Sequence, residues 1–307
     1  MKKATRQAYG ETLVKLKNHP DLVVLDADLS GATKTDIFAK AVPDKFFNLG
    51  IAEADLIGTA AGLALGGKRP FASSFAIFAA GRAYEQIRNA VAYQKLNVVI
   101  AATHAGITVG EDGGSHQAIE DLALMRVIPG MTILNPADDL ETEAAIDAIL
   151  AQNGPVYLRL GRLAVQRVHK TKPVFDIGKG ETLTEGADGT IIATGLMVQE
   201  VLEAAKILAK QRIKVRVLNF STIKPLDEAL VLQAARETPW IITAEEHSII
   251  GGLGSAVAEF LAEHHPANVV KIGVKDCFGQ SGDPKLLKEH YGLTAENLVN
   301  RVVQLNK

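Results

Sequence analysis

A carboxylate, two aromatic rings and two histidines follow one another in the first half of the chain. Glu53 opens a segment of small residues, Phe75 and Phe78 come later, and His104 and His116 flank a glycine-rich acidic loop. A carboxylate can share a proton with a ligand, and imidazoles can carry protons or donate to a developing alkoxide. Flat aromatic rings suit a flat heterocycle and exclude water. These residue types together therefore predict a catalytic set.

No recognisable metal or phosphate loop accompanies this set. His104, Asp112 and His116 fit no spacing typical of zinc sites, so no metal ligand is predicted. The single cysteine, Cys277, rules out a thiolate cluster and an intramolecular disulfide, and it is expected to be buried as a small apolar residue. A catalytic set without a phosphate-binding part suggests that the rest of the site lies on another chain.

The bulk composition is that of a globular protein. The 307 residues are enough for two domains with their own cores, and 47% are hydrophobic while 22% are charged. A net charge of -2 without basic clusters argues against a nucleic-acid partner. Since no apolar run reaches membrane-spanning length and no signal peptide is evident, we expect no membrane partner and a cytoplasmic location.

Strand-like and helix-like segments alternate almost throughout, which predicts an α/β fold of two doubly wound domains with largely parallel sheets. The first domain is expected over 1–165, a connector rich in Lys, Pro, Gly and Thr over 166–187, and the second domain over 188–307. In the first domain we expect strands at 21–26, 68–74, 97–103, 131–134 and 156–160, and helices at 52–65, 77–93, 118–125 and 138–150, with Asp138 as a helix cap. In the second we expect strands at 190–195, 215–220, 240–243 and 269–272, and helices at 198–210, 227–236, 252–263 and 295–305.

Glu53 with Gly58 and Gly62 resembles the pyrimidine-domain motif of thiamine diphosphate enzymes. In that family the Glu hydrogen-bonds the N1′ nitrogen of the cofactor's aminopyrimidine. Phe75 and Phe78 resemble the aromatic pair that lines this pocket in transketolases. The resemblance thus implies thiamine diphosphate as cofactor, held by a pyrimidine-binding fold, although Gly81 departs from the Tyr that transketolases often carry there.

The segment from Thr103 to Gln117 is similar to the transketolase substrate loop, with Gly110-Glu111-Asp112-Gly113 at its centre. The resemblance implies that His104 and His116 contact the hydroxyls and the phosphate end of a sugar phosphate, and that Asp112 contacts a sugar hydroxyl.

Four further residues are assigned through the same resemblance. Arg6 and Arg162 match substrate-phosphate arginines, because guanidinium groups bind phosphate in a bidentate way, with Arg159 as a rival for the second role. Asp28 and Ser30 lie on the loop after the first strand, where the family brings groups to the cofactor and the sugar phosphate. The family's phosphate-binding Ser falls on Ala32, so Ser30 is a substitute candidate.

The resemblance covers a pyrimidine-binding domain followed by a C-terminal domain. The segments Ala244–Ser248 and Gly251–Gly254 resemble the transketolase C-terminal domain, where no cofactor site is expected; the glycine order also differs from a dinucleotide fingerprint. The Gly-Asp-Gly…Asn motif, which holds magnesium and the diphosphate in the family, is missing. The chain is therefore interpreted as the C-terminal subunit of a split transketolase, with magnesium ligands on an N-terminal partner subunit in an α2β2 heterotetramer.

Three alternatives stay open. A deoxyxylulose-phosphate synthase-like enzyme is suggested by Tyr84-Glu85-Gln86 and Ala105-Gly106-Ile107, and the beta subunits of 2-oxo-acid dehydrogenases share the architecture. The Glu111-Asp112-Gly113 loop with its two histidines favours transketolase, the transfer of a two-carbon ketol unit from a ketose phosphate to an aldose phosphate. A non-catalytic α/β binding module is a hypothesis of another class, against which the joint presence of Glu53, both Phe and both His argues.

Overall fold

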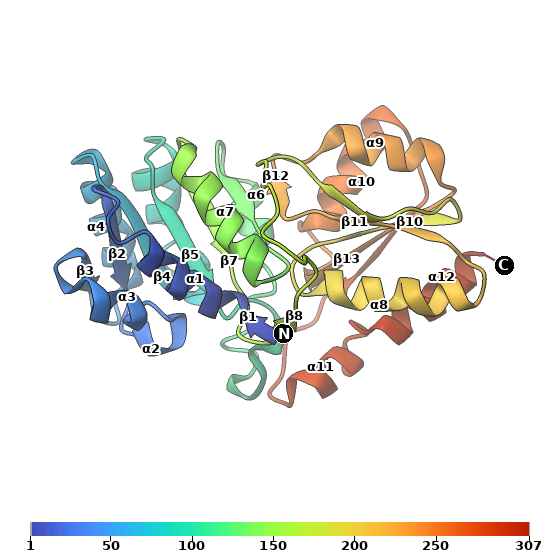
Figure 1. Cartoon of the computed structure of the whole chain (residues 1–307), viewed down its shortest axis with the longest axis horizontal. Helices are drawn as coiled ribbons and strands as arrows, with labels where there is room; N and C mark the ends of the chain where they lie inside the picture. The colour runs from blue at the N-terminus through green and yellow to red at the C-terminus, as the bar shows by residue number, and fades with distance from the viewer. Residues whose placement is uncertain (1, 307) are drawn as a thin grey trace.

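Two β-sheets, each covered by helices on both faces, follow one another along the long axis of the molecule (Figure 1). The computed structural model describes residues 2–306. This architecture confirms the predicted α/β fold with largely parallel sheets. Within the described residues, no helix is both long and apolar enough to cross a membrane.

The first sheet has seven strands in the order β12-β6-β7-β5-β4-β2-β3, and only β12 runs antiparallel to its neighbour. The strands β2, β4 and β5 are almost fully buried, as expected for parallel strands covered on both faces. The strands are β2 (Leu22–Asp26), β3 (Phe46–Asn48), β4 (Arg69–Phe75), β5 (Val99–Thr103), β6 (Thr132–Leu134), β7 (Val156–Arg159) and β12 (Thr222–Lys224).

Successive residues of β2 point to opposite faces of this sheet. Val24 packs in a core with Tyr9 of α1, whereas Leu25 packs in a second core with Leu56 of α4. Asp138 caps α7 by accepting a hydrogen bond from the Glu141 backbone N–H at 2.8 Å, as predicted. The helices of this half are α1 (Thr5–Lys15), α2 (Ser30–Thr33), α3 (Asp36–Ala41), α4 (Glu53–Leu65), α5 (Tyr84–Gln86), α6 (Asp121–Arg126) and α7 (Asp139–Ala151).

The helix predicted over 77–93 differs from a regular α-helix. Phe78–Arg82 and Ile87–Ala92 are π-helical, with the single α-helical turn α5 between them. π-Helical turns inside helices occur frequently at functional sites. Here the first wide turn carries Arg82 back over the ring of Phe78.

The second sheet has five strands in the order β14-β13-β10-β11-β9, and β9 runs antiparallel to β11. Helices α8 and α12 share a core on one face, around Val201 and Val302, whereas α9 and α10 pack on the other, around Val231 and Val257. The elements are β9 (Glu181–Thr184), β10 (Gly189–Ala193), β11 (Val215–Asn219), β13 (Ile241–Ser248), β14 (Val269–Val274), α8 (Met197–Lys210), α9 (Glu228–Glu237), α10 (Leu253–His264), α11 (Pro284–His290) and α12 (Ala295–Leu305).

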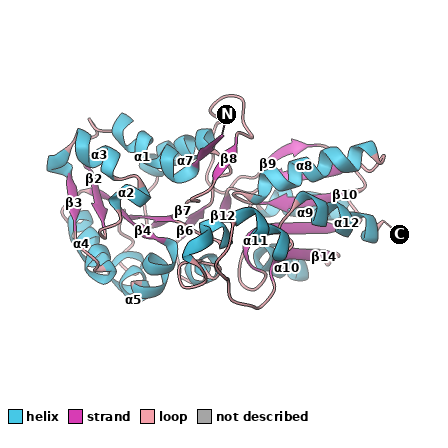
Figure 2. Cartoon of the chain, turned by 90° about the horizontal axis from the view of Figure 1, so that it is seen from below, coloured by secondary structure: helices cyan, strands magenta, loops and turns pink. Residues whose placement is uncertain are grey.

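The chain crosses between the two halves more than once (Figure 2). Strand β12 follows β11 of the second sheet, yet it pairs with β6 and ends the first sheet. The short strands β1 (Lys2–Ala4) and β8 (Ala164–Gln166) pair with each other in a separate antiparallel two-stranded sheet. The predicted connector over 166–187 contains β9, an edge strand of the second sheet.

Cys277 is exposed, so the prediction that it is buried was wrong. It lies between β14 and α11, beside Phe278, whose exposed fraction is 91%. Residue type alone gives a preference for burial but does not place a residue on a strand or in a loop.

His169 joins the two halves through an ionic contact. Its Nδ1 lies 2.9 Å from Asp138 Oδ2 at the start of α7, and its Nε2 lies 2.9 Å from Glu181 Oε2 on β9. Burial opposes the charged ring, but hydrogen bonds to the two carboxylates outweigh it and raise the pKa of His169 to about 10. The imidazolium therefore bridges the halves at neutral pH.

We expect His169→Gln to lower the free energy of unfolding at pH 6 by about 1–3 kcal/mol, the usual size for a hydrogen bond to a charged group. Because the folded-state pKa of His169 lies above its ordinary value of 6.5, its stabilisation is complete below that value and is lost as the pH rises through about 10. Denaturant melts at pH 6, 8 and 10 should show the difference between wild type and variant shrinking. A difference that does not change with pH would contradict the ionic bridge.

Candidate active site

The carboxyl ends of β2, β4 and β5 meet at one edge of the first sheet, because these strands are parallel neighbours. The loop after β2 carries Asp28 and Ser30, the end of β4 leads through Phe75 to Phe78, and β5 runs directly into His104. Ligands of open α/β sheets bind at such edges. The topology thus gathers predicted site residues that are far apart in the sequence.

Glu53 is the first residue of α4 and is 5% exposed. Its Oε1 accepts a hydrogen bond from Arg82 Nη1 at 3.1 Å, and the same guanidinium lies over the Phe78 ring, with Cζ 4.2 Å from the ring centroid. Phe75 is nearly parallel to Phe78, with centroids 5.9 Å apart. The predicted carboxylate and aromatic pair are therefore close together, and Arg82, which sequence reasoning missed, links them.

His104 lies in a directed chain of hydrogen bonds. Arg6 Nη1 lies 3.0 Å from His104 Nε2, and since a guanidinium can only donate, Nε2 must accept. The proton of the neutral ring is then on Nδ1, which donates to Thr103 Oγ1 at 2.9 Å. Phe75 stacks on the His104 ring with centroids 3.8 Å apart, which fixes the orientation of the imidazole.

Burial, followed by the charges of Arg6, Arg162 and Lys34, lowers the pKa of His104 to about 3. The ring is therefore neutral over the whole physiological range. It can accept a proton at Nε2 or donate one from Nδ1, but it does not act as a standing cation. Lys34, which sequence reasoning did not single out, adds to the positive field at this point.

Arg6 combines a fixed end with an available donor. Its Nη1 also donates to the Ala32 carbonyl of α2 at 2.7 Å, which ties it to the turn that begins at Ser30. The buried Nε–H of Arg6 has no acceptor among residues 2–306. A buried guanidinium donor without an acceptor suits an anionic ligand.

Arg162 and His116 connect the acidic loop to this cluster. Arg162 Nη1 lies 3.4 Å from Asp112 Oδ2 and 3.7 Å from Glu111 Oε2, and it also donates to the Val109 carbonyl. His116 meets the Phe78 ring edge-on, with centroids 5.3 Å apart. Asp112, His116 and Arg162 therefore border the same cluster as Phe78 and His104.

Arg159 is not available as the second phosphate arginine. Its Nε donates to Asp121 Oδ2 at 2.8 Å, and its Nη2 donates to the Glu246 carbonyl at 3.0 Å. Both side chains of this ion pair are at least 96% buried. Arg159 thus ties β7 to α6 and to β13 of the second half.

The second half supports the acidic loop without entering the catalytic cluster. Glu246 Oε1 accepts from the Thr108 backbone N–H at 2.7 Å, and Ser281 Oγ donates to the Glu111 carbonyl at 2.6 Å. Gly106 has a φ of +83°, and an added Cβ would lie 2.3 Å from Glu246 Cδ. Only glycine allows the loop to pass this close to Glu246.

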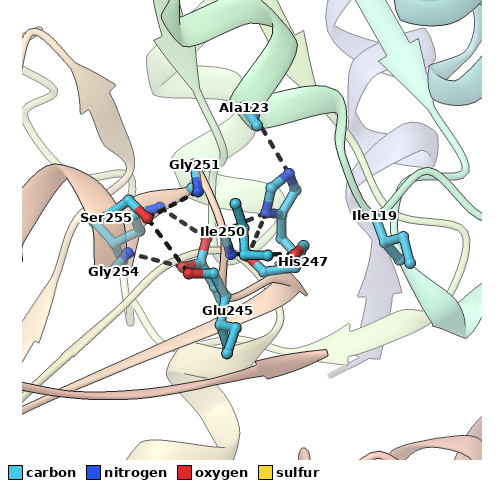
Figure 3. Close-up of polar contacts among 12 residues, drawn as sticks. Ile119, Ala123, Glu245, His247, Ile250, Gly251, Gly254 and Ser255 are labelled. Carbon is cyan, nitrogen blue, oxygen red and sulfur yellow. Dashed lines mark hydrogen bonds and ion pairs between the residues drawn. The ribbon is translucent and has the colours of Figure 1, made fainter. Parts of the chain in front are cut away.

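Figure 3 shows the glycine-rich turn of the second half, where Glu245 points at the start of α10. Its two carboxylate oxygens accept from the backbone N–H groups of Leu253, at 2.7 Å, and Gly254, at 2.8 Å. A carboxylate of the chain itself therefore holds the amides that could otherwise bind a phosphate. His247 accepts from the Ala123 N–H of α6 at 3.4 Å, which adds a contact between the halves.

Asn48 orders the loop that carries Asp28. Its Oδ1 accepts from the Asp28 N–H at 3.0 Å, and its Nδ2 donates to Asp28 Oδ1 at 3.1 Å. Asp28 has a φ of 62°, a left-handed conformation that these bonds support. Asp26 holds the other side of the loop by accepting from Thr33 Oγ1 at 2.7 Å. Asp28 thus has a fixed and exposed carboxylate, next to Ser30.

These residues fit one half of thiamine diphosphate. A planar N–H donor, the Arg82 guanidinium, already lies between the Glu53 carboxylate and the Phe78 ring, so the space suits the aminopyrimidine. For a metal, the group of His, Cys, Asp and Glu side chains close enough to share an ion within residues 2–306 is Glu141, His169 and Glu181, none of which belongs to this cluster.

Comparisons with known proteins return transketolases along the whole chain. Residues 1–167 match the family model of the transketolase pyrimidine binding domain, and residues 178–298 match that of the transketolase C-terminal domain. The chain is 49% identical to a transketolase C-terminal section of Methanocaldococcus jannaschii, covering 98% of this chain and 96% of that protein. It is 46% identical to the 6-deoxy-6-sulfo-D-fructose transketolase subunit SqwH of a Clostridium species, covering 96% and 92%.

A solved split-gene transketolase, described as an inactive β4 tetramer, superposes with a TM-score of 0.92 at 55% identity and covers 98% of this chain and 97% of that one. A 1-deoxy-D-xylulose-5-phosphate synthase of Symbiobacterium thermophilum is 38% identical over 97% of this chain, which spans about half (46%) of that enzyme. The similarity thus extends to the deoxyxylulose-phosphate synthases, one of the alternatives suggested by the sequence.

Replacing Arg6 with Gln should raise the pKa of His104 from about 3, without passing its ordinary value of 6.5, because a neighbouring cation is removed while burial stays. NMR titration of the imidazole C–H signals checks this, with Lys34→Gln as a comparison that should give a smaller rise. An unchanged or lower pKa in the Arg6 variant would contradict the arrangement of charges.

Gly106→Ala should lower the free energy of unfolding by about 1–3 kcal/mol, since the new Cβ meets Glu246 and the backbone conformation is strained. Gly62→Ala is the matched control: in helix α4 its Cβ meets nothing within 4 Å, so it should stabilise by up to about 1 kcal/mol. Chemical denaturation of the chain measures both. Equal stability of the two variants would contradict the close approach of Gly106 to Glu246.

Proposed function

Because the chain belongs to the transketolase family, as the C-terminal section of a split enzyme, we propose that it provides the aminopyrimidine half of a thiamine diphosphate site. A second, N-terminal subunit provides the diphosphate half together with the magnesium ligands. The observation that carries this proposal is the buried Glu53 carboxylate beside Phe78, at the carboxyl ends of the parallel strands.

When bound, the cofactor supplies the nucleophilic carbon that accepts and releases a two-carbon unit. Glu53 holds the proton at the aminopyrimidine nitrogen, and burial keeps water from competing for it. Phe75 and Phe78 provide flat apolar surface for the ring. Asp28, on its ordered loop, is the further cofactor contact that we propose.

The cations of this chain select a sugar phosphate as substrate. Arg6, with its unpaired Nε–H, and Arg162, beside Asp112, bind the phosphate, with Ser30 adjacent. In this structure Arg6 donates a hydrogen bond to Nε2 of His104, so the lone pair of this nitrogen is occupied. A phosphate that engages Arg6 frees Nε2, which then accepts the proton of a substrate hydroxyl while Thr103 holds Nδ1. His116 and Asp112 contact the remaining hydroxyls.

A cofactor site divided between two polypeptides requires a partner subunit. Relatives that match this chain over nearly their full lengths include a C-terminal section and a subunit, and a solved relative is described as an inactive β4 tetramer. We therefore propose an α2β2 heterotetramer in which each site lies between two chains. The ketol donor and the acceptor are proposed as ketose and aldose phosphates.

A coupled assay with xylulose 5-phosphate and ribose 5-phosphate, plus thiamine diphosphate and magnesium, tests the function. We expect activity from the mixture of this chain with its N-terminal subunit, and none from either alone. Glu53→Gln in the mixture should lower kcat by about 10²–10⁴-fold, the usual contribution of a proton-transfer group, whereas the exposed Glu263→Gln should not.

Activity of this chain alone would overturn the proposal that the site is divided between two chains. Formation of 1-deoxy-D-xylulose 5-phosphate, without turnover of the pentose phosphates, would instead favour the deoxyxylulose-phosphate synthase-like alternative, since a synthase of that name also matches this chain. Full activity of the Glu53→Gln variant mixed with the N-terminal subunit would show that Glu53 has no catalytic role.

A further inference from the structure

Arg82 makes a hydrogen bond and a cation–π contact, both with groups assigned above to the cofactor. Its Nη1 donates to Glu53 Oε1 at 3.1 Å, and its guanidinium lies 4.2 Å from the centroid of Phe78. Within residues 2–306, no other group donates a hydrogen bond to the Glu53 carboxylate. The Arg82 side chain thus contacts both the Glu53 carboxylate, which would share a proton with the cofactor, and the Phe78 ring, which would carry the aminopyrimidine.

A guanidinium resembles an aminopyrimidine in the properties that these contacts recognise. Both are planar, both present N–H groups in the plane to a carboxylate, and both lie flat on an aromatic ring. The contacts with Phe78 are mutually exclusive, because the part of the ring that the guanidinium covers cannot carry a second planar group. The Glu53 carboxylate can accept more than one hydrogen bond, so the exclusion rests on the ring. On the basis of the proposed function, we propose that Arg82 is an internal stand-in for the aminopyrimidine, and that cofactor binding exchanges it for the ring.

The surroundings of Arg82 suit such an exchange. The Arg82 side chain is 55% exposed, whereas that of Glu53 is 5% exposed, so the arginine can move into solvent while the carboxylate stays. Arg82 ends the π-helical turn Phe78–Arg82, next to Gly81, where an added Cβ would meet nothing within 4 Å, so the space beside the turn is open. Until the cofactor arrives, Arg82 compensates the buried charge of Glu53, which would otherwise lack a partner.

The exchange predicts that Arg82 opposes cofactor binding. Its ion pair and its ring contact must both break, and contacts of these kinds at partly exposed sites together correspond to about a three- to tenfold change in Kd. Arg82→Met keeps the apolar length and removes the charge and the donors. Arg88→Met is the matched control, since Arg88 is exposed on the following helical segment and donates to Asn89 instead.

The test is calorimetric titration of thiamine diphosphate, with magnesium in excess, into the complex of this chain with its N-terminal subunit. We expect Arg82→Met to bind about three- to tenfold tighter than wild type, and Arg88→Met to bind like wild type. Without cofactor, thermal unfolding of the chain should occur at a lower temperature for Arg82→Met than for Arg88→Met. Arg82→Lys, which keeps the charge and loses the planar face, should tighten binding less, and it serves as the test if Arg82→Met does not fold.

An unchanged Kd in Arg82→Met would overturn the exchange, and a weaker Kd would show instead that Arg82 stays in place as a ligand of the cofactor or of its phosphates. Either result leaves the proposed function standing if the wild-type complex binds the cofactor. A wild-type complex that binds no thiamine diphosphate would overturn both proposals together.

Discussion

The buried ion pair between Arg159 and Asp121 holds in place the arginine through which the first half binds the second sheet. It is almost fully removed from water, and Arg159 reaches further to the Glu246 carbonyl of the second sheet. Because one charge of such a pair is costly to bury without the other, the pair allows few alternative arrangements of β7, α6 and β13. Glu246 is thereby placed where its carboxylate holds the Thr108 N–H, and with it the acidic loop beside the active-site cluster.

This arrangement divides the work between the halves. The first sheet presents Glu53, the phenylalanine pair and His104 along one edge, whereas the second half fixes the loop that carries Asp112 and His116. Glu245 accepts the hydrogen bonds of the backbone N–H groups at the start of α10, so the glycine-rich turn of the second half makes internal contacts. The charges at the site are likewise arranged around His104, whose neutral state depends on burial and on the cations of Arg6, Arg162 and Lys34.

Much of the fold could be predicted from the sequence, because buried parallel strands and amphipathic helices leave clear periodic patterns, as at 97–103 and 295–305. Glu53, Phe75, Phe78 and His104 were predicted from their resemblance to transketolase motifs, and the parallel strands bring them to one edge of the first sheet. Arg82 was missed because its position depends on a π-helical turn, which the periodicity of the sequence does not indicate. Strand β12, Glu246 and Ser281 act across long sequence distances, and the exposure of Cys277 depends on where β14 ends.

A structure of the assembled complex with thiamine diphosphate and magnesium bound would show whether the site is divided between two chains. We expect the aminopyrimidine against Glu53 and Phe78 of this chain, and the diphosphate and magnesium on residues of the N-terminal subunit. A diphosphate held by residues of this chain, or an aminopyrimidine bound away from Glu53, would contradict this expectation.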